Sequence, residues 1–180
     1  MTAHSTDIAP TIVLQTERLR IRHMTTSDAA FMLEMLNDEA WLRCIGDRGV
    51  RTLIDARRYI LDGPVEMVGR LGFGFHVVES KESGCPIGVA GLARRDFLDD
   101  DDIGYAFLPA YRGQGYAFEA AGAVLAHAEQ DLGLKRIVAT VRAGNAASIA
   151  LLHKLGLRFE RTIAHPDGTR DLQLFAIAFA

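Results

Sequence analysis

The segment 103–130 constrains the fold of this chain more than any other part of it. A short apolar stretch at 103–108 is followed by a loop that contains Gly113 and Gly115, and then by a long run of small apolar residues. Between positions 117 and 128 the apolar residues recur at i, i+4, i+7, i+8 and i+11, which is one face of a helix. The segment therefore predicts a strand, a glycine-containing loop and a helix, in that order.

This junction also predicts a binding chemistry. The first turn of a helix has backbone N–H groups without partners and carries about half a positive charge. Gly113 and Gly115 let a phosphate approach the backbone closely, and Arg112 adds a cation with several donors. The loop is not a Walker A loop, and it is not the dinucleotide fingerprint, because the third glycine position of G-x-G-x-x-G falls on Phe118. We therefore expect a phosphate or pyrophosphate site.

The remaining elements follow from hydrophobic periodicity and capping signals. Strands are expected at 12–24, 72–79, 86–94, 103–108, 136–142, 157–163 and 171–179. Helices are expected from the cap Thr25 to about Asn37, from the cap Thr52 to about Leu61 where Gly63-Pro64 stops the helix, from Gly115 to 132, and over 146–155. The predicted fold is one α/β (α+β) domain at 11–180, with a mixed sheet of about six or seven strands and about four helices. Residues 1–10 are expected to be frayed.

Composition excludes several classes of protein. The 180 residues are 49% hydrophobic and 24% charged, which is too apolar for intrinsic disorder and too interrupted by charge for a membrane protein. A net charge of −3 argues against nucleic-acid binding. Cys44 and Cys85 have no metal-ligand spacing, so no metal is expected, and residues 1–10 contain no apolar export signal. We expect a cytoplasmic domain that binds neither nucleic acid nor membrane.

Three motifs resemble one family. The segment Arg112–Ala117 matches the [QR]-x-x-G-x-[GA] acetyl-CoA loop of the GNAT acetyltransferase superfamily. The wider string around it is similar to the branch that includes ribosomal-protein N-terminal acetyltransferases, the Rim type. Thr16–Arg22 resembles the T-E-R-L-x-L-R start of that branch. Asn145-x-x-Ser148, followed by 154–157, resembles its N-x-x-S…K-x-G-F segment. The resemblance covers nearly the whole chain.

The resemblance implies a sheet that splits between the parallel strands 103–108 and 136–142, with acetyl-CoA lying across the split. Phe107 and Leu108 would offer backbone groups to the pantetheine arm, and Asn145 and Ser148 would lie near the thioester or the CoA arm. The residues implied for the pyrophosphate are Arg112, Gly113, Gln114, Gly115, Tyr116 and Ala117. The implied reaction is direct transfer of an acetyl group to a primary amine, either a small molecule or a protein N-terminus. A homodimer is compatible with this interpretation.

The proton-transfer groups are harder to assign. Removing a proton at pH 7 costs about 4.6 kcal/mol for a lysine-like amine but only about 1 kcal/mol for an α-amine, so an α-amine suits a site without a strong base. Asp102, in the acidic turn 99–102, is our candidate proton acceptor, directly or through water, and the alternative is a solvated acidic turn. In an enzyme, this turn would also favour a cationic acceptor by general electrostatic steering. Leu152 occupies the position at which many family members have a proton-donating tyrosine. Ser148 is the candidate replacement, and the alternative is a serine that bonds locally at a helix start. Tyr105 could face the acceptor or pack in the core.

Three functions stay open. The first is an acetyl-CoA-dependent N-acetyltransferase. The second is an acyl-CoA-binding module with little or no turnover, suggested by Leu152 and the lack of a clear base. The third is a nucleotide-phosphate binder that uses the same loop.

Overall fold

One eight-stranded sheet organises residues 10–180, which are the residues that this computed structural model describes. The strands are β1 (Ile12–Gln15), β2 (Leu19–Arg22), β3 (Phe75–Ser80), β4 (Pro86–Ala93), β5 (Asp102–Phe107), β6 (Arg136–Val141), β7 (Arg158–Ala164) and β8 (Asp171–Ala178). Their order in the sheet is β1-β2-β3-β4-β5-β6-β8-β7. The expected frayed segment 1–10 lies outside the described residues, except for Pro10.

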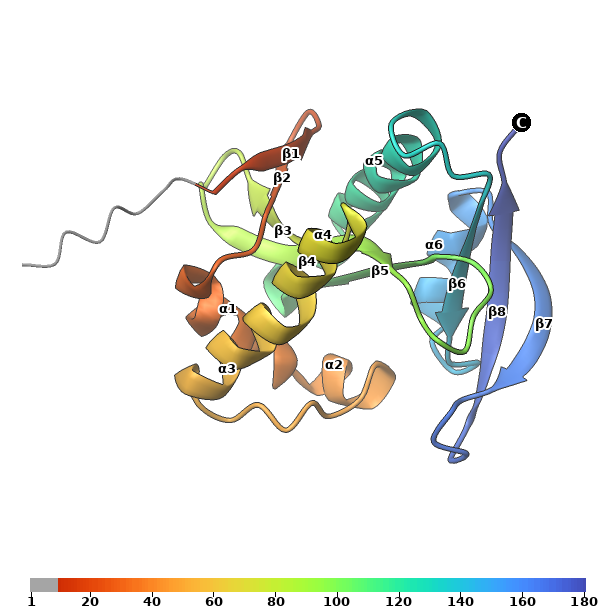
Figure 1. Cartoon of the computed structure of the whole chain (residues 1–180), viewed down its shortest axis with the longest axis horizontal. Coiled ribbons are helices and arrows are strands. Elements are labelled where there is room, and N and C mark those ends of the chain that lie inside the picture. The colour runs from red at the N-terminus through yellow and green to blue at the C-terminus, as the bar shows by residue number, and fades with distance from the viewer. Residues whose placement is uncertain (1–9) are drawn as a thin grey trace, which may run out of the picture.

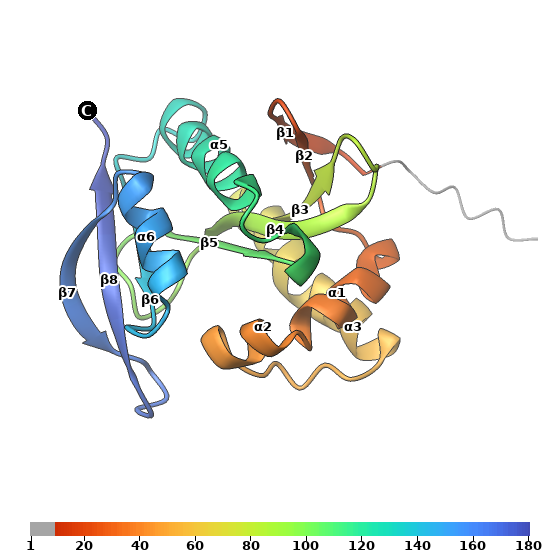
Figure 2. The ribbon, with the colours of Figure 1, turned by 180° about the vertical axis from the view of Figure 1, so that it is seen from behind.

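Helices cover both faces of this sheet. They are α1 (Ala29–Leu36), α2 (Glu39–Cys44), α3 (Leu53–Ile60), α4 (Glu66–Leu71), α5 (Tyr116–Gln130) and α6 (Ala146–Lys154). In Figure 1, α3 and α4 lie in front of the sheet, and the reverse view in Figure 2 brings α5 and α6 to the front. Neighbouring strands are antiparallel except β5 and β6, which α5 connects as a parallel pair. The mixed α+β sheet with one parallel pair is confirmed.

The sheet has one strand more than expected because the single strand predicted at 12–24 was wrong. It is a hairpin in which β1 pairs antiparallel with β2. The backbone N–H of Thr16 donates to the carbonyl of Leu19 at 3.0 Å, and the Thr16 hydroxyl accepts from the N–H of Leu19 at 3.0 Å. A threonine side chain closes this turn without glycine, proline, asparagine or aspartate, so the usual turn signals were absent.

The number of helices was also underestimated. The helix after Thr52 does not stop at Gly63-Pro64 but continues through the π-helical turn 61–65 into α4, and it ends at Gly72, where φ is +78°. The wider turn accommodates the proline ring and its missing N–H, so the chain stays helical. The short helix α2, which the carboxylate of Asp38 caps, was not predicted. Residues 10–180 thus contain the six α-helices α1–α6, of which α3 and α4 form one continuous helix, where about four helices were expected.

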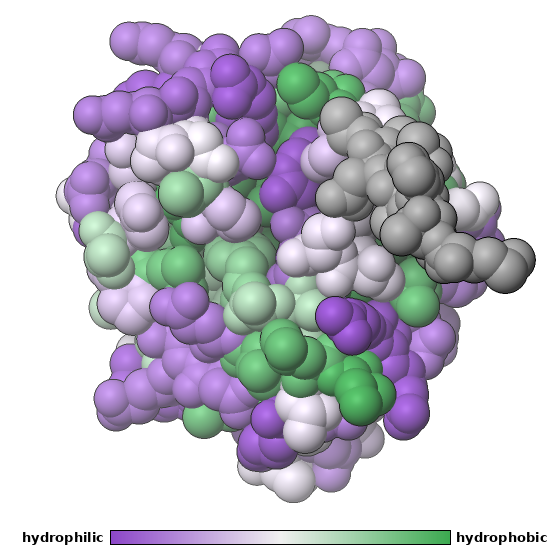
Figure 3. All heavy atoms as spheres, turned by 90° about the vertical axis from the view of Figure 1, so that its left-hand side faces the viewer, coloured by the Kyte–Doolittle hydropathy of each residue, from purple (hydrophilic) through white to green (hydrophobic). Residues whose placement is uncertain are grey.

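The core has two parts, one on each face of the sheet. The larger part joins the sheet to α5 and contains Phe175, Leu19, Ile87 and Ile137 among its fully buried side chains. The smaller part lies under α1 and α3. Figure 3 views the side that carries the β1–β2 hairpin and α1, and there apolar and polar surface are interleaved. Of the parallel pair, β6 contributes to the larger part, whereas β5 and the residue after it contribute to both parts.

One buried histidine makes the stability of this core dependent on pH. His76 on β3 is 6% exposed, stacks on His23 at 5.3 Å between ring centroids, and has a buried Nδ1 without a hydrogen-bond partner among the described residues. Burial, and secondarily the nearby His23 and His127, lower the pKa of His76 to about 4. Between pH 6.5 and about 4 the imidazole of His76 is protonated in the unfolded chain but stays neutral in the folded chain. The free energy of unfolding is therefore highest above pH 6.5 and decreases as the pH falls toward 4.

We expect this histidine to contribute about 3 kcal/mol to the loss of unfolding free energy between pH 7 and pH 4. Urea unfolding at both pH values measures it. The His76→Leu variant should show a smaller loss than the wild type, and His153→Gln, which changes an exposed histidine, should show the same loss. An equal pH dependence in His76→Leu and the wild type would contradict the expectation.

Candidate functional site

The loop between β5 and α5 has the backbone that the glycines predict. It passes through the short 3-10 turn η3 (Pro109–Tyr111) and then through Gly113 and Gly115, whose φ angles are +71° and +83°. Residues other than glycine rarely adopt these angles. A Cβ on Gly113 would meet nothing within 4 Å, so the space beside this turn is open.

The backbone N–H groups at the start of α5 are free. Within residues 10–180, the N–H groups of 113–117 donate to no backbone carbonyl outside the helix, and no side chain caps α5. The side chain of Gln114 does not plug the turn, because its Nε2 donates to the carbonyl of Ala110 at 2.7 Å. Five adjacent donors at the positive end of a 15-residue helix are the kind of arrangement at which anions bind, and the expected pyrophosphate contact stays a prediction.

Arg112 is held by the chain itself. Its Nε donates to the carbonyl of Phe107 at 2.9 Å, and its Nη2 lies 2.5 Å from the carboxylate of Asp38. Partial burial opposes the effect, but the hydrogen bonds from Arg112 and from the N–H of Trp41 lower the pKa of Asp38. Arg112 thus ties the loop to the N-terminus of α2. Its expected contact with pyrophosphate stays a prediction.

A second arginine lies against the same loop, and the sequence reasoning did not find its role. Nη1 of Arg18, from the β1–β2 turn, donates to the carbonyl of Gln114 at 3.0 Å, and its Nε donates to Glu119 at 2.6 Å. Its guanidinium lies 4.4 Å from the centre of the Tyr116 ring. Its Nη2 would lie 3.3 Å from a Cβ on Gly115. The only sequence signal for Arg18 was its place in the start motif.

The parallel strands β5 and β6 separate just after they meet. Their only register pair is Asp102 with Val138, and the N–H of Val138 donates to the carbonyl of Asp101 at 3.0 Å. The next N–H of β6 that faces β5, that of Thr140, donates to the carboxylate of Asp102 at 3.1 Å and not to a strand carbonyl. The Asp102 side chain therefore ends the ladder, and beyond it β5 and β6 form a split.

Asp102 has a different environment from the one we expected. It is 3% exposed, and its Oδ2 lies 2.9 Å from Nε of Arg95, so both carboxylate oxygens have partners. Burial raises the pKa of Asp102, and Arg95 and the Thr140 N–H counteract this. Both carboxylate oxygens are thus engaged inside the fold, which gives Asp102 a structural role. Its role as the proton acceptor stays a prediction.

The acidic turn 99–102 is also not a solvated negative surface. Asp100 pairs with Arg136 at 2.8 Å, and Asp101 pairs with Arg94 at 2.9 Å. Three of its four carboxylates are thus neutralised by arginines, counting the pair of Asp102. The sequence led us to expect that this turn attracts a cationic acceptor. Because arginines from other segments of the chain already neutralise most of its carboxylates, this expectation loses its basis.

Two hydroxyl groups meet across the split. The hydroxyl of Tyr105 on β5 lies 3.1 Å from Oγ of Ser148, in the first turn of α6. The N–H of Ser148 donates to the side chain of Asn145 at 3.2 Å, so Asn145 caps this helix. Leu152, one turn further along, is 2% exposed. The structure therefore brings together Ser148 and Asn145, which were predicted, and Tyr105, which was left open.

Some backbone N–H and C=O groups at the end of β5 already have hydrogen-bond partners, and others face the split. The carbonyl of Phe107 accepts from Arg112, and the N–H of Leu108 donates to Ile87 on β4 at 3.0 Å. Because backbone groups alternate in direction along a strand, those of Ile103 and Tyr105 face the split. The N–H of Phe107 faces the split by the same alternation. The predicted cofactor contacts at Phe107 and Leu108 stay predictions.

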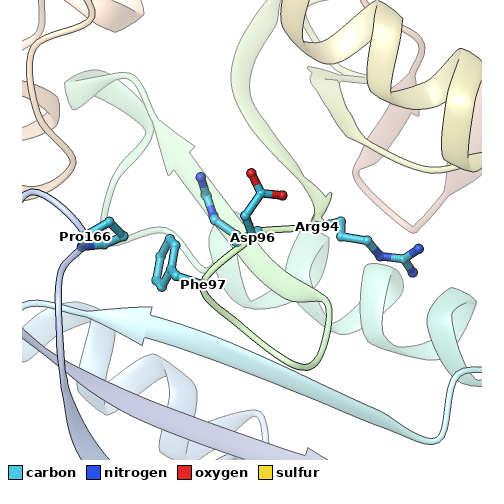
Figure 4. A pocket seen from close by; sticks show the side chains of 5 residues that line it. Arg94, Asp96, Phe97 and Pro166 are labelled. Carbon is cyan, nitrogen blue, oxygen red and sulfur yellow. The ribbon is translucent and has the colours of Figure 1, made fainter.

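A cavity of about 430 Å³ lies at the other end of β5 from the glycine loop. Arg94, Arg95, Asp96 and Phe97 line it from the β4–β5 connection, and Pro166 lines it from the β7–β8 turn (Figure 4). Arg94 and Arg95 are ion-paired with the acidic turn. Asp96 has no ion pair among the described residues, so the lining has one uncompensated negative charge.

A split between parallel strands, next to a helix N-terminus with free N–H groups, is an arrangement that can hold a phosphate-bearing ligand along a strand. Comparison with known proteins specifies the class of protein. The family model of the acetyltransferase (GNAT) domain matches residues 18–158, and the chain belongs to the GNAT family of acetyl-CoA-dependent acetyltransferases.

Individual relatives agree with this assignment. The chain is 30% identical over 147 residues to YnaD, an uncharacterized N-acetyltransferase of Bacillus subtilis, covering 82% of this chain and 83% of YnaD. A GnaT-family acetyltransferase from Bordetella pertussis has 30% identity and a TM-score of 0.76, covering 92% of this chain and 99% of that one. The RimL ribosomal-protein acetyltransferase in complex with coenzyme A shares the fold, with a TM-score of 0.79 at 20% identity over 93% of this chain and 97% of that one.

No helix within residues 10–180 has the length and apolar character needed to cross a bilayer. No cluster of three or more His, Cys, Asp or Glu side chains there could hold a metal ion.

Proposed function

We propose that the chain transfers the acetyl group of acetyl-CoA to a primary amine, either the α-amine of a protein N-terminus or a small-molecule amine. The observation that carries the proposal is the row of free N–H groups at 113–117, beside a split between β5 and β6. The family assignment favours this function over a nucleotide-phosphate binder.

The residues present fit the cofactor. The N–H groups of 113–117 would bind its diphosphate, and the split would hold its pantetheine arm against the backbone edge of Ile103 and Tyr105. From Asp102 to Phe107 this edge extends about 17 Å, at about 3.3 Å per residue, so it can accommodate an extended arm. When bound, acetyl-CoA supplies a thioester whose carbonyl carbon accepts the amine nitrogen.

The side chains at the split have distinct roles in this proposal. Asn145 holds Ser148 at the start of α6, and Ser148 donates a proton to the departing sulfur. Asp102 separates the two strands and is not the base. Because no strong base remains, an α-amine is the favoured acceptor: its deprotonation at pH 7 costs about 1 kcal/mol, against about 4.6 kcal/mol for a lysine-like amine.

The acceptor would enter from the cavity at the start of β5. Its lining combines the unpaired carboxylate of Asp96 with the apolar surfaces of Phe97 and Pro166. A carboxylate attracts an ammonium group before it loses its proton, and the apolar surfaces can contact its neighbouring carbons. This supports an amine next to a small apolar group.

Arg18 supplies a prediction for the cofactor loop. Arg18→Ala removes the donor to the carbonyl of Gln114 and the cation beside Gly115, so the affinity for CoA should fall about tenfold, which equals about 1.4 kcal/mol. Isothermal titration measures it. Arg20→Ala is a matched control, because Arg20 is similarly exposed on β2 but pairs with Glu79. Equal CoA affinities of Arg18→Ala and the wild type would remove Arg18 from the site.

The function is tested by thiol release. Acetyl-CoA is incubated with a panel of small amines and peptides with free N-termini, and the free CoA thiol is measured over time. We expect release that requires an amine, with N-terminal α-amines above lysine side chains at pH 7. Binding of CoA without release for any amine would indicate the acyl-CoA-binding module. Thermal stabilisation by ATP or NAD, and not by CoA, would indicate the nucleotide-phosphate binder.

A further inference from the structure

The hydrogen bond between Tyr105 and Ser148 joins the two sides of the split. Tyr105 lies on β5, whereas Ser148 lies on the helix that follows β6, and the two residues are 43 positions apart. The Tyr105 hydroxyl is 3.1 Å from the Ser148 Oγ and 3.4 Å from the Ser148 carbonyl. A ligand arm in the split would therefore pass beside both hydroxyl groups.

We propose that Tyr105 is a positioning residue whose hydroxyl donates to Oγ of Ser148 and thereby turns the Ser148 proton into the split, toward the CoA sulfur. This inference rests on the proposed function and extends it. A tyrosine hydroxyl has one proton, and the shorter distance is to Oγ. With that lone pair of Ser148 occupied, the serine proton is left free to point away from Tyr105.

Without Tyr105, the serine has competing partners. A serine in the first turn of a helix commonly bonds to nearby backbone or to the cap residue, which here is Asn145. Leu152, on the same helix, has no hydrogen-bond donor that could take over the role of the Ser148 hydroxyl. Burial raises the pKa of Tyr105, with the Ser148 bond opposing this, so the tyrosine remains protonated over the pH range in which amines react.

The proton balance is complete without any further reactant. As the amine nitrogen bonds to the acetyl carbon, the carbon–sulfur bond breaks and its electron pair goes to sulfur. Ser148 gives its proton to that sulfur, Tyr105 gives its proton to Ser148, and Tyr105 regains a proton from water. The amine releases one proton to water, so the net change is one amide and one thiol.

Tyr105→Phe keeps the ring and removes the hydroxyl. We expect kcat to fall about tenfold. This is below the usual contribution of a general acid, about 100-fold or more, because a thiol leaves readily. The KM for acetyl-CoA should change less than about twofold. Ser148→Ala should lose at least as much. The double variant should be no slower than Ser148→Ala, because both changes remove the same pathway of proton donation to the sulfur. Tyr111→Phe is the matched control: its ring lies in the same segment, and its hydroxyl has no hydrogen bond within residues 10–180.

A second readout does not depend on turnover. Ultraviolet titration of the thiolate in the CoA complex gives the pKa of the bound thiol, which a hydroxyl donor lowers because it stabilises the anion. We expect a lower value in the wild type than in free CoA, and a higher value in Tyr105→Phe and Ser148→Ala than in the wild type. Thermal unfolding with and without CoA confirms that each variant folds and binds.

The outcomes separate the two proposals. A wild-type protein that acetylates no amine contradicts the proposed function, while the thiol titration still tests the Tyr105–Ser148 pair. If the wild type is active, a bound-thiol pKa in Tyr105→Phe equal to that of the wild type overturns the inference. Additive losses in the double variant, or a rise in KM at unchanged kcat, also overturn it, because each shows that Tyr105 only packs against the arm.

Discussion

Replacement of Gly115 by valine is expected to lower the affinity for CoA by about 100-fold or more, equivalent to about 2.7 kcal/mol, in a protein that still folds. At Gly115 φ is +83°, and a Cβ would lie 3.3 Å from Nη2 of Arg18. The branched side chain would occupy the turn in which the diphosphate meets the N–H groups of 113–117. The backbone cost of a left-handed residue is about 1–2 kcal/mol, which a domain of ordinary stability tolerates.

Gly84→Val separates backbone strain from blockage of the site. Gly84, in the turn between β3 and β4, has φ of +68°, and a Cβ there would meet nothing within 4 Å. This variant should lose similar stability and keep wild-type CoA affinity. Titration calorimetry with CoA, together with thermal unfolding, measures both quantities. Wild-type affinity in a folded Gly115→Val protein would show that the diphosphate binds elsewhere.

Asp102→Ala is expected to lower the free energy of unfolding by about 3 kcal/mol. It leaves Arg95 and the N–H of Thr140 without their shared partner, and breaking a buried pair costs about 3–5 kcal/mol. The lower end applies because the Arg95 side chain is 34% exposed. The same variant should weaken CoA binding, because the carboxylate that separates β5 from β6 is gone.

Urea unfolding of Asp102→Ala, Asp102→Asn and Asp99→Ala tests this role. Asp99 is an exposed neighbour without an ion pair in the described part of the chain, so its variant should stay within about 0.5 kcal/mol of the wild type. An Asp102→Asn protein with wild-type stability and CoA affinity but no acetyl transfer would restore Asp102 as the proton acceptor. Lost stability in Asp102→Asn supports the structural role.

Local signals predicted the elements that depend on neighbouring residues. The capping box at Thr52 is present, with the Thr52 hydroxyl accepting from the N–H of Asp55 at 3.1 Å. The α5 helix starts directly after Gly115, as its glycine and apolar stripe indicate. Elements that depend on distant contacts were missed. The turn at Thr16 is held in part by Glu119, which accepts from the Thr16 hydroxyl at 2.5 Å.

In the candidate site, too, the features set by neighbouring residues were predicted and those set by distant contacts were missed. Its glycine loop is a contiguous motif, so the sequence was sufficient to predict free N–H groups there. The Arg18 contact to Gln114 spans 96 positions, and no local pattern indicates it. The surroundings of Asp102 were missed for a related reason: in sequence it is one of four adjacent aspartates, whereas in the fold Arg95 and Thr140 enclose it. Charge counting along a chain does not show which charges are paired.

A crystal structure of the CoA complex would test most directly where the cofactor binds. The expected result is a diphosphate whose oxygens accept hydrogen bonds from the N–H groups of 113–117, with the pantetheine arm between β5 and β6. A diphosphate bound away from that turn, with those N–H groups still free and the split closed, would contradict the account.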